Sequence, residues 1–454
     1  MLKKFLNTRE INQIENIYSE KNAYCFPNNF YRSQDTFSIQ PRGGVGRISA
    51  QLNLMKDLEA AGADFLPITV DSYTRMGDLE QASAILESEN LYGVETLNGF
   101  PICSHDINEV RWLVRQFERP VCLRHGTPYP KDVFKSSLLS GVTEFEGGAL
   151  SYVLPYSRRA DLKTAIEQWS WVELAIGQLN TSGVMVSRES FGPLSATLVP
   201  PIVIVLVQLV ELIFAISCGV RSYTVTLPEL HNHEQTMLCK LAIEQFGETI
   251  KEIAGNEIQI FFGLHQWMSV FPPSKFKANA LIATSSQFAA QAGFDKLITK
   301  TAVEAIKIPT AKDNCEAIEL IKYVRTNSSF KSVQNWNIEE VELIYLVASI
   351  KEILGEFFLL AKGYRCGHNS IADLQNEILH LVETGQIDIP FAPHEKNNNK
   401  IVSTLDHMGW IRMLDTGNLS LVDGFSAYEM SKAKDRVKNS SVSEIIQKDI
   451  FIKC

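Results

Sequence analysis

The 454-residue sequence predicts an α/β fold, a (β/α)8 TIM-type barrel with a mostly helical C-terminal appendage. Short apolar runs alternate with amphipathic helical stretches over about 270 residues, which is typical of repeated strand–helix units. Charged side chains follow several of these runs directly. After Pro309 the alternation stops and the sequence becomes mostly helical. A doubly wound open sheet is the alternative, because periodicity does not show whether the two edges of a parallel sheet meet.

The predicted strands are short apolar runs that polar or glycine-containing segments interrupt. They are Phe37–Gln40, Phe65–Val70, Val94–Asn98, Pro120–Arg124, Thr143–Glu146, Val184–Ser187, Ser222–Leu227, Ile258–Phe262 and Lys296–Thr299.

Between the strands, the spacing of apolar residues predicts helices. In Ala165–Leu179 and Thr236–Ile253 the large apolar side chains recur every three or four residues. That spacing places them along one stripe of a helix, which can pack against a sheet.

The segment Leu198–Ser217 is almost wholly apolar and requires a choice between a membrane span and a buried helix. A transmembrane helix needs about 20 predominantly apolar residues. Pro200, Pro201, Gln208 and Glu211 interrupt the run, and a glutamate near its centre would be costly in lipid. The segment is therefore predicted to be a buried helix of the barrel.

These patterns divide the chain into three parts. Residues 1–35 form an N-terminal arm, residues 36–310 the barrel, and residues 311–454 the C-terminal appendage. The appendage is predicted to be mostly helical over 311–384, including Val341–Leu360.

Composition narrows the class of protein. A chain that is 45% hydrophobic and 21% charged is expected to fold, and its net charge of -9 argues against a general nucleic-acid surface. Its eight cysteines include no C-x-x-C pair, which indicates reduced thiols. The N-terminus lacks the apolar run of a signal peptide. We therefore expect a cytoplasmic protein that binds neither nucleic acid nor membrane.

Charged residues stand where successive predicted strands end. Arg42 and Arg75 follow the first two strands, Arg124 and His125 end the fourth, and Glu146 ends the fifth. In a barrel these ends meet at one mouth, where active sites lie. Guanidinium groups bind carboxylates in a bidentate geometry that lysine does not provide. Any single arginine could instead form a surface ion pair, but together these residues suit a small substrate with two carboxylates and an ammonium group.

Other motifs indicate less. Gly43–Gly46 satisfies neither phosphate-binding pattern, so it is interpreted as a loop that lets the backbone approach a ligand closely. His231 and His233 lack a third ligand at a suitable spacing and are expected to be solvated loop residues. No metal site is predicted. There is no H-E-x-x-H and no G-x-S-x-G.

Ordered blocks between about residues 39 and 425 match one enzyme family. The blocks are Gln40–Val45, Ala63–Arg75, Leu97–Pro101, Arg124–Pro128, Glu146–Tyr156, Phe191–Pro201, His265–Met268, Phe271–Pro272, Lys300–Thr310 and Asp388–Phe391. Through them the sequence resembles the epsilon (large, catalytic) subunit of glutamate mutase, also called methylaspartate mutase.

The resemblance implies roles for particular residues. Arg42, Arg75 and Arg124 would hold the two substrate carboxylates, and Glu146 the substrate ammonium group. The remaining substrate contacts implied by the family are His125, Tyr152 and Tyr156. The positions that match contacts to adenosylcobalamin (coenzyme B12) are Gly44, Asn98, Pro155, Phe271, Lys300, Glu304 and Ile308, with Lys300 and Glu304 on the ribose.

The resemblance also implies the reaction and the partners. The family consists of radical isomerases that interconvert L-glutamate and L-threo-3-methylaspartate in glutamate catabolism. The cobalamin is shared with a separate small cobalamin-binding (sigma) subunit, and two large subunits form a heterotetramer with two small ones. Proteins that bind cobalamin through a histidine carry the motif Asp-x-His-x-x-Gly. The nearest string in this sequence, Asp406–Gly409, has the wrong spacing, so a separate subunit is expected to bind the cobalamin.

Some residues depart from the family pattern. Val153 replaces an expected polar residue, Cys122 and Ala149 also differ, and Pro201–Ala215 is unusually apolar. These departures leave open a mutase of the same radical mechanism that acts on another amino-dicarboxylate in specialised metabolism. A catalytically silent partner of a cobalamin-binding subunit is a further alternative. An unrelated barrel lyase or aldolase would need either a metal cluster at strand ends or a Schiff-base lysine, for which only Lys300 is suitably placed.

Overall fold

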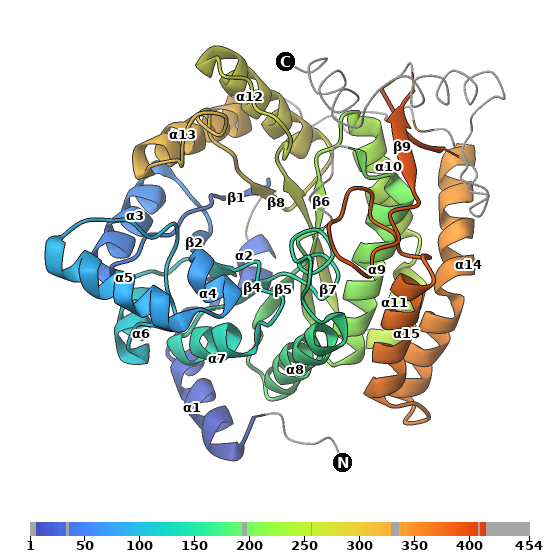
Figure 1. Cartoon of the computed structure of the whole chain (residues 1–454), viewed down its shortest axis with the longest axis horizontal. Coiled ribbons are helices and arrows are strands. Elements are labelled where there is room, and N and C mark those ends of the chain that lie inside the picture. The colour runs from blue at the N-terminus through green and yellow to red at the C-terminus, as the bar shows by residue number, and fades with distance from the viewer. Residues whose placement is uncertain are drawn as a thin grey trace.

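The computed structural model describes residues 6–32, 36–192, 198–255, 257–327, 336, 338, 340–406 and 409–414. A central group of strands is surrounded by helices, with the last helices packed along one side (Figure 1). The predicted arm lies outside the described residues at 1–5 and 33–35, and the predicted appendage does so at 328–335, 337, 339, 407–408 and 415–454.

Eight parallel strands form the central sheet, and neighbours in the sheet are neighbours in the chain. They are β1 (Ser38–Gln40), β2 (Leu66–Thr69), β3 (Val121–Arg124), β4 (Glu144–Glu146), β5 (Ser187–Glu189), β6 (Ser222–Pro228), β7 (Gln259–His265) and β8 (Lys296–Ile298). β8 pairs with β1. The Phe65 N–H donates to the Ile39 carbonyl over 3.1 Å, and the Thr69 N–H to the Gly43 carbonyl over 3.0 Å, so β1 and β2 also meet. The predicted TIM-type barrel is confirmed, and the open sheet is excluded.

Helices cover the outside of the barrel, and further helices precede the first strand and follow the last one in the chain (Figure 1). The barrel helices are α3 (Ile48–Ala61), α4 (Ser72–Met76), α5 (Leu79–Tyr92), α6 (Ile107–Arg115), α7 (Lys131–Ser140), α8 (Leu162–Thr181), α9 (Pro201–Ser217), α10 (His233–Glu244), α11 (Gly247–Ala254) and α12 (Lys275–Gln291). The helix α13 (Ala311–Asn327), which begins the predicted appendage, packs against α3 and α12 and so also covers the barrel. The remaining elements are α1 (Thr8–Ser19), a 3₁₀ turn at Ala23–Cys25, α2 (Pro27–Arg32), α14 (Glu340–Arg365), α15 (Ile371–Glu383), β9 (Val402–Leu405) and β10 (Ile411–Leu414).

The predicted strand Val94–Asn98 is wrong. Its Thr96 and Leu97 N–H groups donate to the side chain of Glu89, at the end of α5, and not to a neighbouring strand. The segment is therefore a loop. Just after it, Phe100 forms an isolated parallel bridge with Val70.

Two other predicted boundaries also differ. The strand predicted at Val184–Ser187 begins at Ser187 and runs to Glu189. The helix predicted at Thr236–Ile253 is divided into α10 and α11 at Phe246, whose buried ring packs against Phe358 at a centroid distance of 5.6 Å.

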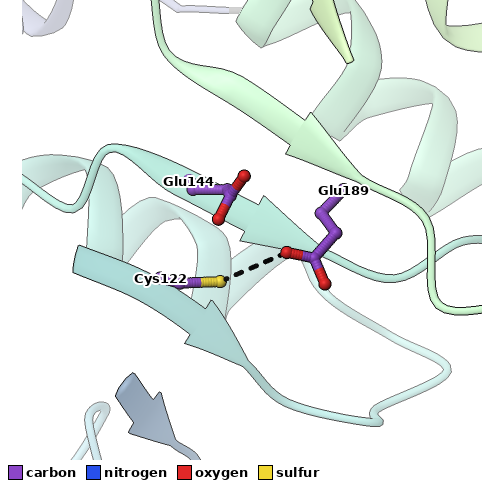
Figure 2. A group of neighbouring side chains, drawn as sticks. All are labelled: Cys122, Glu144 and Glu189. Atoms are coloured by element: carbon purple, nitrogen blue, oxygen red, sulfur yellow. Dashed lines mark hydrogen bonds between the residues drawn. The ribbon is translucent and has the colours of Figure 1, made fainter. Parts of the chain in front are cut away.

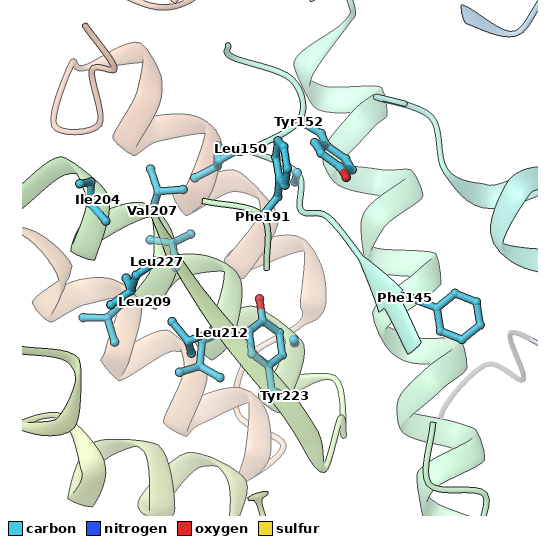
Figure 3. Close-up of a cluster of buried hydrophobic side chains, with 14 of the residues drawn as sticks. Phe145, Leu150, Tyr152, Phe191, Ile204, Val207, Leu209, Leu212, Tyr223 and Leu227 are labelled. Carbon is cyan, nitrogen blue, oxygen red and sulfur yellow. The ribbon is translucent and has the colours of Figure 1, made fainter. Parts of the chain in front are cut away.

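Helix α9 is the apolar segment, and every one of its residues is buried. The helices α10, α11 and α14 pack along it, and α14 lies on its outer side in Figure 1. Its leucine, isoleucine and valine side chains join the barrel core (Figure 3). The prediction of a buried barrel helix is confirmed, and the appendage explains why the helix is apolar on all sides. Among the described residues, no helix has both the length and the apolarity that crossing a membrane requires.

The N-terminal arm packs against the barrel end where the strands begin. Phe30 and Tyr31 of α2 form a small apolar cluster with Phe65, which precedes β2. The Tyr31 and Phe65 rings stack at 5.2 Å. Above them lies the ammonium group of Lys296, the first residue of β8, at 4.3 Å from the Phe65 ring and 5.7 Å from the Tyr31 ring. These aromatic rings close the lower end of the barrel.

Candidate active site

A cavity of about 750 Å³ opens at the barrel end where the strands finish. All seven residues predicted to contact substrate line it: Arg42, Arg75, Arg124, His125, Glu146, Tyr152 and Tyr156. Thr69, Ser72, Met76, Phe191, Arg158, Arg159 and Met268 also contribute to its wall. The structure therefore brings together the charged residues that the sequence placed at successive strand ends.

Arg124, the last residue of β3, is buried between two carboxylates. It forms an ion pair with Glu146 at the end of β4, and its Nη1 lies 3.0 Å from Glu189 Oε1 at the end of β5. Burial by itself lowers the pKa of Arg124, but the two carboxylates outweigh burial and raise it. The guanidinium is thus fixed as a cation before any ligand arrives.

Arg42 and Arg75 lie in a different environment. Among the described residues, neither forms an ion pair with a carboxylate. Arg75 Nε donates to the Val70 carbonyl over 2.6 Å, and burial lowers the pKa of its guanidinium, with Arg42 contributing repulsion. Two guanidinium groups of this cavity are therefore available for an anionic ligand.

Glu146 is a buried carboxyl group that can change its charge near neutral pH. Burial raises its pKa to about 7, although Arg124 opposes the shift. The Tyr152 hydroxyl donates a hydrogen bond to Glu146. Burial raises the pKa of Tyr152 well above 10, so its hydroxyl keeps the proton that it donates.

His125 is a neutral part of the same wall. Burial, with repulsion from Arg188 and Arg75, lowers the pKa of His125 to about 3. Its Nδ1 accepts a hydrogen bond from the Thr127 N–H over 3.2 Å, and its ring stacks on Trp169 at 5.5 Å. An uncharged imidazole can offer a hydrogen bond here without adding to the positive charge.

A buried ionic network that the sequence reasoning missed lies below Arg124. The Lys296 ammonium is 2.6 Å from Glu144 and 2.5 Å from Glu189, and Glu189 in turn contacts Arg124. Figure 2 shows Glu144 and Glu189 with the Cys122 thiol, whose sulfur lies 3.8 Å from Glu189 Oε2. These three side chains lie close enough to hold a metal ion. Lys296 already supplies the cation, and burial raises the pKa of Cys122, so the group is better described as an ion-pair network.

The sequence held a signal for part of this network. Glu189 ends β5, but the predicted strand stopped two residues earlier, at Ser187. With the correct boundary, Glu189 would have joined the charged residues at strand ends. Lys296 is the first residue of a predicted strand, and no role was assigned to its side chain. In the structure that side chain is completely buried in the barrel.

A second cavity, of about 520 Å³, shares Arg42 and Thr69 with the first. Its wall is rich in glycine and includes four residues predicted to contact the cofactor: Gly44, Asn98, Glu304 and Ile308. Lys300 Nζ lies 2.9 Å from Glu304, and burial together with Arg42 lowers the pKa of Lys300 to about 8. Lys300 itself lines neither cavity, which disfavours it as a Schiff-base lysine for a substrate held in the larger one.

Sequence comparison identifies the family. A family model described as "Methylaspartate mutase E chain" matches residues 25–450. The chain belongs to this family.

Relatives named "Glutamate mutase epsilon subunit" agree with that assignment. The protein from Haloarcula marismortui is 31% identical over 407 residues, which cover 89% of this chain and 81% of that protein. The protein from Desulfitobacterium hafniense is 32% identical over 399 residues, 87% and 81% of the two chains. A dihydropteroate synthase structure from Xanthomonas albilineans covers 64% of this chain and 94% of its own, at 14% identity and a TM-score of 0.37, a likeness too low to carry weight.

Gly44, which follows β1, lies where two loops of the barrel pack closely together. A Cβ atom at this position would lie 2.2 Å from the Thr69 carbonyl and 3.1 Å from the Gly99 Cα. The glycine therefore permits two loops of the barrel to pack together, as well as forming a cavity wall. The interpretation of Gly43–Gly46 as a loop that lets the backbone approach a ligand closely stays a prediction, and Gly43 and Gly44 do line the second cavity.

Three other predictions fit the structure less well. Pro155 and Phe271, predicted cofactor contacts, line neither of the two cavities. The description of His231 and His233 as solvated loop residues is wrong for His233, which starts α10. Its Nε2 lies 2.8 Å from the buried Glu229, and its ring stacks on Phe288 at 4.0 Å.

Proposed function

We propose that this chain is the large catalytic subunit of an adenosylcobalamin-dependent mutase that interconverts L-glutamate and L-threo-3-methylaspartate. Family membership supports a glutamate mutase subunit. The observation that carries the substrate class is the composition of one cavity wall: Arg42 and Arg75 have no carboxylate partner among the described residues, and Glu146 lines the same cavity.

The charges of the wall match those of an amino-dicarboxylate. Arg42 and Arg75 take one carboxylate each, since each presents a fork of N–H donors. Glu146, when ionised, takes the ammonium group. Arg124, held by Glu146 and Glu189, uses its remaining N–H donors to orient whichever carboxylate lies nearest. His125 and Tyr156 complete the polar wall.

The second cavity fits an adenosyl group. Glu304 supplies a carboxylate that accepts hydrogen bonds from sugar hydroxyls, Lys300 orients that carboxylate, and Ile308 offers an apolar face to the base. The buried Thr299 hydroxyl has no hydrogen-bond partner among the described residues and can bond a ligand there. When bound, adenosylcobalamin supplies an organic radical that removes a hydrogen atom from the substrate. Arg42 borders both cavities, so substrate and adenosyl group would meet beside it.

The protein groups bind, orient and shield. Arg124, His125, Glu146 and Tyr152 are buried, so the inner end of the cavity excludes bulk water. Exclusion strengthens each charged hydrogen bond and keeps stray hydrogen donors from a reactive intermediate.

The partner in this proposal is a small cobalamin-binding subunit that covers the barrel mouth, with two large and two small subunits in the assembly. Apolar side chains near the mouth are exposed, including Met76 (74%) and Ile308 (66%). Both line the cavities and would be covered by a docked subunit.

The test is to mix the purified chain with a cobalamin-binding small subunit and adenosylcobalamin, and to follow glutamate by NMR. Formation of methylaspartate is the expected result. Cob(II)alamin that forms only with another amino-dicarboxylate would favour the mutase with a different substrate. If no candidate substrate gives a radical signal, the proposal fails and a catalytically silent role is favoured.

A further inference from the structure

The loop that carries Tyr152 and Tyr156, residues 147–157 and here called the tyrosine loop, is a series of tight turns. Its backbone N–H groups donate from Tyr152 to Gly148 over 3.2 Å, from Leu154 to Leu150 over 3.1 Å, and from Ser157 to Val153 over 2.9 Å. Its first N–H groups, at Leu150 and Ser151, cannot be paired within such turns, as at the start of a helix.

Glu211, in the middle of the apolar helix α9, pairs both of these groups. Its Oε1 accepts hydrogen bonds from the Leu150 N–H over 3.0 Å and the Ser151 N–H over 2.8 Å, and its Oε2 accepts one from the Ser151 hydroxyl over 3.1 Å. In Figure 3, Leu150 and Tyr152 lie above the leucine and valine side chains of this helix. The carboxylate thus joins α9 to the wall of the active site.

Gly148 shows how closely the loop sits on this carboxylate. A Cβ atom at Gly148 would lie 2.0 Å from Glu211 Cδ and about as close to both carboxylate oxygens. Only glycine leaves space for Glu211 beneath the turn, so the two residues form one contact.

Burying a carboxylate at this position costs folding free energy. Glu211 is 6% exposed on a helix whose residues are all buried, and burial raises its pKa to about 7 although the loop N–H groups oppose the shift. Burying a charged group is unfavourable unless hydrogen bonds compensate. An apolar residue would pack here without that cost, so the contact to the loop accounts for the glutamate.

We propose that Glu211 is a positioning residue: by anchoring the first turns of the tyrosine loop, it holds Tyr152 against Glu146 and keeps the substrate cavity formed. The effect on catalysis rests on the proposed function, whereas the anchoring of the loop does not. The loop's other end has separate supports from the appendage. His394 Nε2 hydrogen bonds the Ala160 carbonyl at 2.8 Å, and the Glu395 N–H donates to the Arg158 carbonyl over 3.1 Å.

The anchoring can be measured by limited trypsin digestion of the substrate-free chain. Arg158 and Arg159 are exposed directly after the loop, and cleavage there reports local opening. We expect Glu211→Leu to speed cleavage at these two sites by at least about tenfold. Glu211→Gln, which keeps the acceptor oxygen, should stay within about twofold of wild type. Gly148→Ala disrupts the same contact from the loop side and should speed cleavage as much as Glu211→Leu does.

Leu209→Ala is the matched control, since it creates a buried cavity on the same helix without touching the loop's hydrogen bonds. It should lower Tm and leave cleavage at Arg158 and Arg159 unchanged. Wild-type cleavage rates in both Glu211→Leu and Gly148→Ala would overturn the proposal, as would equally fast cleavage in Leu209→Ala.

The kinetic test uses the chain with its small subunit and adenosylcobalamin. Glu211→Leu should raise KM at least about tenfold with a smaller change in kcat, and Glu211→Gln should largely restore KM. A KM change of the same size in Leu209→Ala would reduce Glu211 to a packing role and overturn the proposal. If the wild-type complex converts no glutamate, the proposed function fails, while the cleavage rates still decide whether Glu211 anchors the loop.

Discussion

Arg124 and the pair Arg42 and Arg75 line one cavity but are held in opposite ways. Arg124 is buried and paired with Glu146 and Glu189. Arg42 and Arg75 are partly exposed and have no carboxylate partner among the described residues. The first guanidinium is part of the folded barrel, whereas the other two have no carboxylate partner in the described part of the chain and can gain one from a ligand.

This difference in pairing predicts that Arg124 contributes to folding stability, whereas Arg42 and Arg75 contribute mainly to ligand binding. Removing one member of a buried ion pair leaves the other charge unpaired in a poor solvent for ions. Removing a guanidinium that has no ion-pair partner leaves no such charge behind. The three arginines that the sequence grouped into one clamp should therefore respond differently to the same substitution.

The largest effect is expected from Arg124→Ala. It leaves Glu146 without its cation and Glu189 with Lys296 alone, so kcat/KM should fall by more than about a thousandfold and the free energy of unfolding by about 3–5 kcal/mol. Steady-state kinetics and urea denaturation measure the two. Arg124→Lys should recover more stability than activity, since lysine keeps the charge without the fork. An unchanged free energy of unfolding in Arg124→Ala would contradict the buried pairing.

Arg42→Ala and Arg75→Ala should each lower kcat/KM about a hundredfold, because each removes a charge-assisted contact to substrate. The free energy of unfolding should change by less than about 0.5 kcal/mol in Arg42→Ala, and slightly more in Arg75→Ala, which also loses the bond to Val70. Near-normal turnover in either variant would remove that residue from the substrate site.

Glu189→Gln and Glu144→Gln test the network below Arg124. Both remove a carboxylate from Lys296 and should cost about 1–3 kcal/mol of stability. Only Glu189 also contacts Arg124, so only Glu189→Gln should raise KM, by about tenfold. Equal KM values in the two variants would show that the network does not orient Arg124.

The smallest effect concerns pH. Glu146, with a pKa raised to about 7, faces Arg124, Glu189, Tyr152 and Arg42. KM should fall as pH rises through about 7, because ionised Glu146 binds the ammonium group. The folding stability of the substrate-free chain should change in the unfavourable direction over the same pH range. A folded pKa above the usual 4.5 means that the stability contributed by Glu146 is present at low pH and is lost as pH rises through about 7. Glu146→Gln should remove this slope in pH-dependent thermal unfolding.

Strand periodicity and the charges at strand ends were enough to predict the barrel and five residues that line the larger cavity: Arg42, Arg75, Arg124, His125 and Glu146. Tyr152 and Tyr156 came from the family resemblance alone, which also assigned roles to the other five. The ionic network was harder to predict. Glu189 and Lys296 lie far apart in the sequence and meet only inside the closed barrel. Periodicity identifies strands but does not show which interior side chains face each other.

The wrong strand at Val94–Asn98 has a comparable cause. Its alternation suits a strand, but the Glu89 side chain satisfies the N–H groups that a neighbouring strand would need. Glu211 was seen only as an interruption of an apolar run, since its partners lie 60 residues away, in the tyrosine loop. In both places a side chain takes the role of backbone pairing, which no local pattern reveals.

The aromatic floor of the barrel has a practical consequence for dissecting this chain. Tyr31 and Phe65 shield the Lys296 ammonium from below, and Lys296 steadies Glu189 and so Arg124. A shortened version starting at residue 36 would keep every strand yet admit water beneath that lysine. The first helices are therefore as necessary to the reaction chamber as the strands, and a truncated barrel would be a poor substitute for the whole subunit.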